Sequence, residues 1–108
     1  MKFEKHKKVL EWAKTFLPKE YPFINEIWLY GSCARNEESF MSDVDLLVMI
    51  PEEYFVKNVL RLIKTETPGY QFPDVDIHCD IGKLYNKEFD NDNYIKNIRK
   101  DAIKIYEK

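Results

Sequence analysis

Asp43 and Asp45 are the residues of this chain best suited to chemistry, because they stand two positions apart where the apolar segment 44–50 begins. Side chains two apart on a strand emerge from the same face, so the two carboxylates would repel each other. A hard cation such as Mg²⁺ relieves that repulsion and also binds phosphate oxygens and water. The alternative is a turn begun by Ser42, with both acids solvated.

A second group of candidates follows the apolar segment 24–30, and ten residues separate Ser32 from Asp43. Gly31 allows a close backbone approach, while the Ser32 hydroxyl and the amides after it can donate to phosphate oxygens. Arg35 adds a planar guanidinium that suits phosphate. The alternative is an ordinary turn at the end of a strand, with Arg35 paired to a glutamate of the following loop.

A third carboxylate for a two-metal site would come from the segment 74–79. Asp76 lies between two apolar residues, where a charge is unusual unless it is paired or binds a metal. Asp74 and Asp80, at the two ends of the segment, are weaker candidates. Together these groups indicate metal-assisted phosphoryl or nucleotidyl transfer, in which a carboxylate helps to activate the attacking hydroxyl.

The elements that would hold these residues follow from hydrophobic periodicity and from turn signals. Helices are predicted over 3–17, 51–64, 83–90 and 94–107, a helical turn over 33–36, and strands over 24–30, 44–50 and 74–79. Ten residues are too few for a parallel crossover. The first two strands are therefore expected to be antiparallel neighbours, with Gly31 and Ser32 beside the two aspartates.

Length and composition favour a single globular domain over residues 1–108. The chain is 44% hydrophobic and 33% charged, and its net charge of −2 gives no sign of nucleic-acid wrapping. Cys33 and Cys79 form neither a disulfide framework nor a zinc pattern, so free thiols in a reducing, cytoplasmic compartment are expected. No signal peptide is recognised, and no apolar run approaches the roughly 20 residues that span a bilayer.

Three segments resemble the signature of the DNA polymerase β-like nucleotidyltransferase superfamily, and more narrowly its minimal nucleotidyltransferase (MNT) domains. They are Tyr30–Arg35, which holds Gly31-Ser32, then Ser42–Leu46, which holds Asp43-Val44-Asp45, and Val75–Ile77, which is centred on Asp76. The combined pattern is more specific than any one piece of it. One departure is Asn36, where many relatives carry glycine, although asparagine also tolerates left-handed geometry.

The resemblance implies an α/β (α+β) fold, with a small mixed three-stranded sheet flanked by helices, and a nucleoside triphosphate such as ATP as donor. It implies three acids that bind Mg²⁺, the last of them a candidate general base: Asp43, Asp45 and Asp76. It places four residues at the nucleotide: Gly31, Ser32, Arg35 and Ser42. Small proteins of this kind are often encoded beside a HEPN partner, where they act as antitoxins and some adenylylate the partner.

The leading hypothesis is an enzyme that moves a nucleoside monophosphate, AMP in the first instance, from a triphosphate to a hydroxyl and releases pyrophosphate. The acceptor would be a tyrosine or serine of a HEPN-type partner. A second hypothesis is a catalytically weak binding module that neutralises such a partner by contact. A third is a small-molecule enzyme of the aminoglycoside type, which the lack of an acceptor domain disfavours. The sequence leaves the oligomeric state open.

Overall fold

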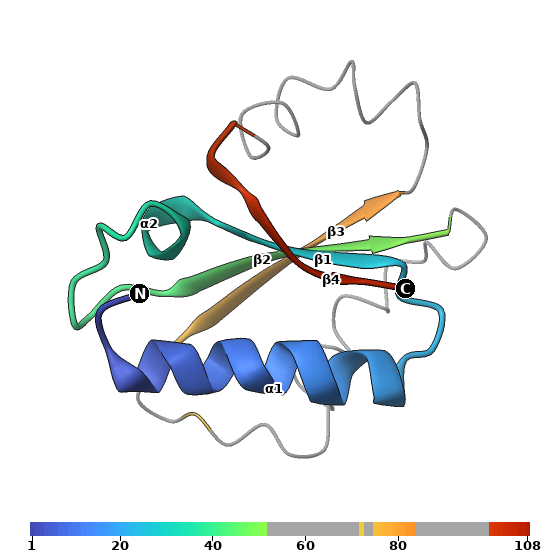
Figure 1. Cartoon of the computed structure of the whole chain (residues 1–108), viewed down its shortest axis with the longest axis horizontal. Helices are drawn as coiled ribbons and strands as arrows, with labels where there is room; N and C mark the ends of the chain where they lie inside the picture. The colour runs from blue at the N-terminus through green and yellow to red at the C-terminus, as the bar shows by residue number, and fades with distance from the viewer. Residues whose placement is uncertain (52–71, 73–74, 84–99) are drawn as a thin grey trace.

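A computed structural model describes residues 1–51, 72, 75–83 and 100–108, in which a long helix lies along one face of a four-stranded sheet (Figure 1). The elements in chain order are α1 (Glu4–Glu20), β1 (Glu26–Tyr30), α2 (Gly31–Ala34), β2 (Val44–Ile50), β3 (Ile77–Lys83) and β4 (Ile103–Glu107). The strand order across the sheet is β3-β2-β1-β4. A mixed sheet with helices confirms the predicted fold class.

α1 forms because its apolar residues recur at helical spacing and face the sheet. Three of its apolar residues are fully buried: Val9, Ala13 and Leu17. The sequence predicts an end before Pro18, whereas the helix continues to Glu20. A proline this near the end of a helix removes only one hydrogen bond to the preceding turn. The helix is closed by Tyr21, whose N–H donates to the Leu17 carbonyl at 2.8 Å.

β1 and β2 are antiparallel neighbours, which confirms the prediction from the short connection between them. Tyr30, the last residue of β1, is paired with Asp45 of β2. β3 runs parallel to β2, with Val44 opposite Ile77. β4 pairs antiparallel with the other edge of β1. The two strands that flank the predicted Gly-Ser and Asp-x-Asp motifs are therefore the two central strands of the sheet.

The two faces of the sheet are packed differently. The face against α1 holds the main core, to which β1 and β2 contribute six residues: Ile27, Leu29, Val44, Leu46, Val48 and Ile50. The other face holds a smaller cluster, in which Trp28, Tyr30 and Ala102 pack against the buried Leu47 and Met49. Successive strand residues alternate between the faces. The unbroken apolar runs of β1 and β2 are thus explained by burial on both sides.

The last segment of the chain is where the sequence prediction is wrong. The periodicity predicts a helix over 94–107, but Ile103–Glu107 forms β4, and within the described residues only Lys100 and Asp101 of that range are helical. The isoleucines at 103 and 105 alternate as strand residues do. Pairing with β4 also covers an edge of β1 whose backbone groups would otherwise stay unpaired. The sheet therefore has four strands among the described residues, not three.

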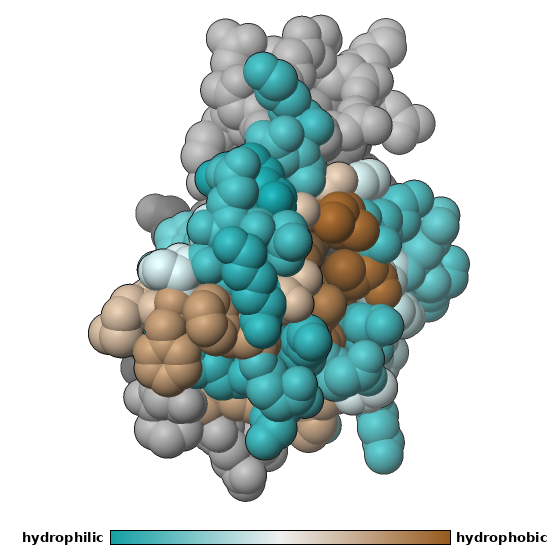
Figure 2. Space-filling model, turned by 60° about the vertical axis from the view of Figure 1, so that its left-hand side comes forward, coloured by the Kyte–Doolittle hydropathy of each residue, from teal (hydrophilic) through white to brown (hydrophobic). Residues whose placement is uncertain are grey.

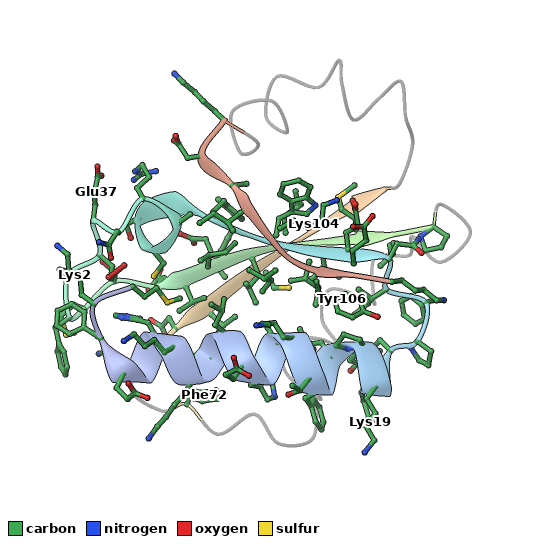
Figure 3. The ribbon with its side chains drawn as sticks, viewed as in Figure 1. Lys2, Lys19, Glu37, Phe72, Lys104 and Tyr106 are labelled. Atoms are coloured by element: carbon green, nitrogen blue, oxygen red, sulfur yellow. The ribbon has the colours of Figure 1, made fainter. Side chains whose placement is uncertain are left out.

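β4 presents side chains to both faces of the sheet. Tyr106 lies opposite Ile27 and Lys104 lies opposite Trp28, with a register irregularity between the two pairs. Figure 3 shows Tyr106 on the α1 side of the sheet and Lys104 on the other side. The Lys104 ammonium lies 3.2 Å from Glu26 Oε2 and 5.2 Å from the centre of the Trp28 ring. These contacts fasten β4 to β1 on the face that α1 leaves open.

The third strand begins later than predicted, at Ile77 rather than at residue 74, and it extends to Lys83. Asp76 therefore precedes the strand instead of lying within it. Several predictions from the sequence lie outside the described residues. These are the helix over 52–64, the segments 84–90 and 94–99 of the two later helices, Asp74, and the side chain of Asp80.

The face drawn in Figure 2 is mainly hydrophilic, and hydrophobic side chains gather on it in limited areas. The large hydrophobic residues that are exposed in the described part of the chain are Phe40, Met41 and Ile103. In that same part, no helix combines the length and apolarity needed to cross a bilayer. Both cysteines are buried and free, as their spacing predicts.

Candidate active site

The pairing of β1 with β2 brings Gly31 against Asp45. Gly31 directly follows Tyr30, the partner of Asp45, and has a φ of +75°, a conformation that glycine adopts without strain. A Cβ at Gly31 would overlap the Asp45 carboxylate and would lie 3.2 Å from its Cγ. The missing side chain of Gly31 is therefore what allows the Asp45 carboxylate to occupy this corner.

Asp43 and Asp76 lie next to each other where β2 and β3 begin. The Val44 N–H donates to the Asp76 carbonyl at 3.0 Å, and Val44 is the register partner of Ile77. Asp43 and Asp76 each stand one residue before a member of this pair, so they lie side by side across the parallel ladder. Asp45 stands one residue after Val44, within β2, whereas Asp43 comes just before that strand.

Asp45 faces the side of the sheet that α1 does not cover, because its neighbours Val44 and Leu46 pack into the core against α1. Asp43 and Asp76 come just before β2 and β3, which are parallel, so both lie at the same end of the sheet. Asp43 and Asp76 are exposed, and Asp45 is partly buried. Among the described residues, no three His, Cys, Asp or Glu side chains form a compact group that could hold a metal ion.

α2 is a single helical turn that begins at Gly31, beside the Asp45 carboxylate. The first N–H groups of a helix have no acceptor within it and carry partial positive charge. In α2 these are the N–H groups of Gly31, Ser32 and Cys33, which point away from the helix and toward acceptors outside it. The turn ends at Arg35, whose N–H donates to the Gly31 carbonyl at 3.2 Å. Asn36 follows with a φ of 58°, the left-handed geometry anticipated for it.

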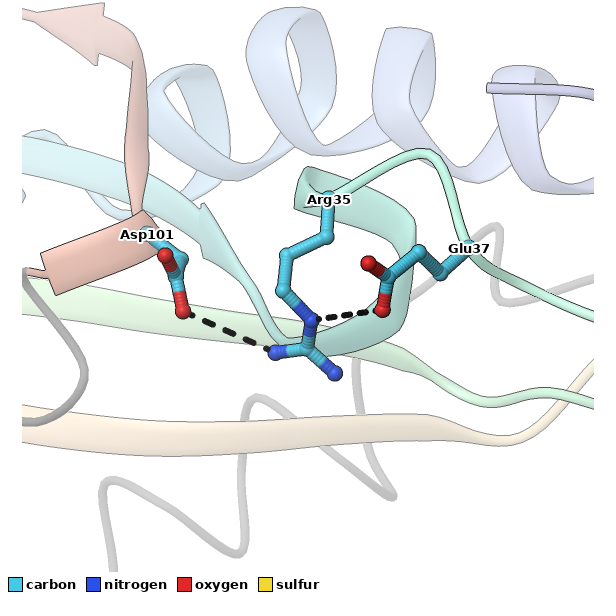
Figure 4. Close-up of polar contacts among 3 residues, drawn as sticks. All are labelled: Arg35, Glu37 and Asp101. Atoms are coloured by element: carbon cyan, nitrogen blue, oxygen red, sulfur yellow. Dashed lines mark hydrogen bonds and ion pairs between the residues drawn. The ribbon is translucent and has the colours of Figure 1, made fainter.

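Arg35 is held by two acids (Figure 4). Its Nε donates to Glu37 Oε2 at 3.1 Å, and its Nη1 lies 3.8 Å from Asp101 Oδ2. The alternative that the sequence leaves open, a pair with a glutamate of the following loop, is therefore present. All three side chains are largely solvated, so each pair contributes only about 0–1 kcal/mol. Exchange of these partners for a phosphate would cost little.

Ser42 shapes the turn that leads into Asp43. Its Oγ accepts a hydrogen bond from the Ser39 N–H at 2.9 Å and lies 3.2 Å from Ser39 Oγ. Its carbonyl accepts a hydrogen bond from His6 Nε2 at 2.8 Å. The Ser42 side chain thus fixes the backbone that carries the first aspartate, and its contact with a nucleotide stays a prediction.

The pKa of the Cys33 thiol reflects the burial and the negative charges around α2. The thiol is 2% exposed and donates to the Asp43 carbonyl at 3.4 Å. Burial, and next the negative charges of Glu38, Asp45 and Asp43, raise the pKa of the Cys33 thiol from 9.0 to about 11. The thiol is therefore neutral near pH 7 and unsuited to act as a nucleophile. The same charges mark a place where a bound cation would be stabilised.

Two buried residues at this end of the molecule escaped the sequence prediction. His6 is fully buried and donates to the Ser42 carbonyl. Glu38 is 2% exposed and accepts a hydrogen bond from the Lys2 amide at 2.6 Å. The sequence alone predicts a solvated surface both for the lysine-rich start of the chain and for the loop that contains Glu37 and Glu38. Only the contact between these two distant segments shows that their titratable residues are buried.

Comparison with known proteins covers almost the whole chain. A family model described as a nucleotidyltransferase domain matches residues 10–106, a range that contains Gly31 and all three aspartates. This chain belongs to that nucleotidyltransferase family. A crystal structure of a candidate nucleotidyltransferase from Sulfolobus solfataricus is similar to it, with a TM-score of 0.57 and 18% identity over 97% of this chain and 86% of that one. At this identity the likeness shows the fold alone. No significant match is found among curated proteins.

The residues of this nucleotidyltransferase domain fit a Mg²⁺ ion with a triphosphate. The donors on the open face are carboxylate oxygens, the ligand type that Mg²⁺ prefers, and the ion usually takes one or two of them together with phosphate oxygens and water. Asp45 in β2 and Asp43, just before it, supply two such carboxylates. An arrangement that is open to solvent leaves room for phosphate ligands, which a closed cage would exclude.

Proposed function

We propose that this protein is a Mg²⁺-dependent nucleotidyltransferase, a single minimal domain over residues 1–108, that moves AMP from ATP to a hydroxyl acceptor. The observation that supports it most is that Asp45 lies against Gly31, while Asp43 and Asp76 are exposed and adjacent where β2 and β3 begin. Membership of the family supports nucleotidyl transfer in general. The choice of nucleotide, the metal and the acceptor belong to this proposal.

Binding of the donor would use the two sides of the β1–β2 corner. Asp43 and Asp45 would hold Mg²⁺, which when bound offsets the negative charge of the triphosphate and polarises its phosphoryl oxygens. The Ser32 hydroxyl and the first amides of α2 would donate to phosphate oxygens. Arg35 would exchange Glu37 for a phosphate, since a guanidinium binds either anion through the same planar fork.

The transfer step needs a proton acceptor, and Asp76 is suited to that role because it is exposed and lies beside Asp43. Its carboxylate would take the proton of the acceptor hydroxyl. The hydroxyl oxygen then forms a bond to the α-phosphorus, while the bond from that phosphorus to the oxygen that bridges it to the β-phosphorus breaks. Pyrophosphate leaves with the electron pair of the broken bond.

The proposed acceptor is a tyrosine or serine hydroxyl on a HEPN-type partner, whose modification would give this protein the role of an antitoxin. The exposure of Asp43 and Asp76 supports an acceptor as large as a protein, since both carboxylates are reachable from solvent. A cytoplasmic location is part of the same proposal. The two buried free thiols support it, because free thiols persist in a reducing compartment.

The test is a transfer assay with ATP labelled at its α-phosphate, Mg²⁺ and a purified HEPN-type protein as the acceptor. The expected result is label on the partner together with an equal amount of released pyrophosphate. Asp43→Asn is expected to abolish both, while Glu20→Gln, an exposed acid at the far end of α1, keeps both. The proposal is contradicted if neither label nor pyrophosphate appears with any of the four common ribonucleoside triphosphates.

A second candidate function is neutralisation of a partner by contact alone, and the pairing of Arg35 with Glu37 and Asp101 favours it. A guanidinium already occupied by two acids would be a poor phosphate ligand if those pairs persist. The two functions are separated by an Asp43→Ala, Asp45→Ala double variant. If this variant still neutralises the partner fully, neutralisation occurs by contact. If the variant no longer neutralises the partner, neutralisation requires nucleotidyl transfer.

A further inference from the structure

The start of the chain and the loop before β2 are joined by a set of contacts that we call the brace. It consists of Lys2, Phe3, Lys5 and His6 on one side and Glu38, Phe40 and Ser42 on the other. In Figure 1 the N-terminus lies beside the beginning of β2, where the loop passes. The brace therefore ties the first residues of the molecule to the segment that holds Asp43 and leads into β2.

Two hydrogen bonds form the buried part of the brace. His6 Nε2 lies 2.8 Å from the Ser42 carbonyl, and because a carbonyl only accepts, this nitrogen carries the proton. Glu38 Oε1 accepts the Lys2 N–H at 2.6 Å. Both bonds connect positions 36 residues apart. Each one fixes a backbone group of the partner segment, so together they set where the loop lies relative to α1.

Two ring contacts form the outer part of the brace. The Phe3 and Phe40 rings meet edge to face, with centroids 5.6 Å apart and an interplanar angle of 80°. The Lys5 ammonium lies 3.6 Å from the centre of the Phe40 ring, within the range of a cation–π contact. Phe40 thereby holds the middle of the loop against α1, although 58% of its surface is exposed.

The buried atoms that lack partners show what these two residues contribute. His6 Nδ1 and Glu38 Oε2 are buried without a hydrogen-bond partner in the described part of the chain. A buried polar atom without a partner is destabilising, so apolar side chains of similar size would pack better at both positions. Packing alone therefore does not account for His6 and Glu38, whereas the hydrogen bonds that they make to the other segment do.

We propose that His6 and Glu38 are positioning residues, which hold Asp43 in the place where it binds the metal of the proposed function. Ser42 immediately precedes Asp43, so the His6 bond fixes the peptide that leads into it. On the other side of Asp43, the Val44 N–H is fixed by the Asp76 carbonyl. A metal ligand has to be held within about 0.5 Å of its productive place, and a free loop would lose conformational entropy to reach it.

The experiment compares His6→Gln, which keeps a side-chain N–H donor, with His6→Leu, which removes it. Val9→Ala is the matched control, because Val9 is a fully buried α1 residue that makes no contact of the brace. Three quantities are measured on each: hydrogen–deuterium exchange over residues 38–44, binding of Mn²⁺ by its effect on water relaxation, and the Mg²⁺ concentration that gives half-maximal transfer. Glu38→Gln and Glu38→Leu repeat the comparison if His6→Leu does not fold.

We expect His6→Leu to raise exchange over residues 38–44 and to weaken Mn²⁺ binding about tenfold, the scale of losing an outer partner of a metal ligand. The half-maximal Mg²⁺ concentration rises by the same factor, and saturating Mg²⁺ restores most of kcat. His6→Gln stays close to wild type, and Val9→Ala lowers the melting temperature without changing metal affinity. The proposal is overturned if His6→Leu matches wild type, or if either comparison variant is as weak in Mn²⁺ binding as His6→Leu.

Failure of the proposed function gives a different pattern. A wild-type protein that neither binds Mn²⁺ nor transfers nucleotide would refute the proposed function. The hydrogen–deuterium exchange data would then test only whether His6 holds the loop. Faster exchange over residues 38–44 in His6→Leu but not in His6→Gln would support its hold on the loop. Equal exchange in the two variants would overturn it.

Discussion

The two faces of the sheet differ in what they contribute, although β1, β2 and β3 supply residues to both. Leu46 is fully buried beneath α1 among other apolar side chains. Asp45, its neighbour in sequence, lies on the opposite face against Gly31. Apolar burial on the α1 side stabilises the fold, whereas the partial burial of the Asp45 carboxylate on the other side carries a desolvation cost.

The face to which a strand residue points therefore decides whether we expect it to contribute to stability or to catalysis. Residues of β2 that face α1 should be sensitive in unfolding experiments and nearly silent in kinetics. Asp45 on the other face should show the reverse. Variants of adjacent residues on β2 therefore make a stringent comparison, since the two residues share a strand but not a face.

The largest effect is expected for Asp45→Asn, which keeps the size of the side chain and removes its charge. Nucleotidyl transfer should fall more than about a hundredfold, because loss of even an outer partner of a metal ligand reaches that size. The free energy of unfolding should change by less than about 1 kcal/mol, since asparagine keeps the size and shape of the side chain. Urea unfolding and initial rates of pyrophosphate release measure the two quantities. A large loss of unfolding free energy together with the loss of transfer rate would contradict the difference proposed between the two faces.

Leu46→Ala should give the opposite result on the neighbouring residue. The free energy of unfolding should fall by about 2–5 kcal/mol, because a buried leucine is replaced by a cavity beneath α1. The transfer rate per folded molecule should stay within about twofold of wild type, a difference of only about 0.4 kcal/mol in the barrier. The same two assays apply, at a temperature where the variant remains folded. A large loss of rate in fully folded Leu46→Ala would show that the core also sets the geometry of the site.

A smaller effect, on the pH dependence of the free energy of unfolding, is expected from Cys33. The unfolded thiol has the ordinary pKa of 9.0 and the folded one a pKa of about 11, so the unfolded chain loses its proton first. Stability should therefore decline as the pH rises from 9.0 to about 11, by at most about 1.4 kcal/mol per pH unit. The measurement is urea unfolding of wild type and of Cys33→Ala across this range. The decline should be steeper in wild type, and parallel curves would contradict the cause assigned to the shift.

The smallest effect is expected for Arg35→Ala. Its ion pairs with Glu37 and Asp101 are exposed, so the free energy of unfolding should change by less than about 1 kcal/mol. The KM for the nucleotide should rise several-fold while kcat changes less, if the guanidinium exchanges these acids for a phosphate. Steady-state kinetics decide the point. An unchanged KM would assign Arg35 to the surface network alone.

The sequence was informative where neighbouring residues along the chain determine the structure. The short connection after Ser32 fixed the antiparallel pairing of β1 with β2, and β2 has the predicted bounds. The position of Gly31 beside Asp45 follows from that pairing. The same-face placement of Asp43 and Asp45 stays a prediction, since Asp43 comes just before β2. Such features depend on local spacing and are independent of how distant segments pack.

Predictions from the sequence were wrong or incomplete where contacts between distant segments determine the structure. Residues 103–107 form β4 because β1 offers an edge more than 70 residues earlier in the chain, which a local pattern cannot reveal. His6 and Glu38 are buried by each other's segments, and neither segment has the composition of a core. Pro18 is tolerated because α1 ends soon after it. In each case tertiary packing overrides the local preference.

The most direct test of the central claim is a crystal structure of the protein with Mn²⁺ and a non-hydrolysable ATP analogue. We expect an anomalous peak within about 2.3 Å of carboxylate oxygens of Asp43 and Asp45, with the triphosphate against the first turn of α2. Nucleotide bound elsewhere, or a metal that touches neither aspartate, would contradict it.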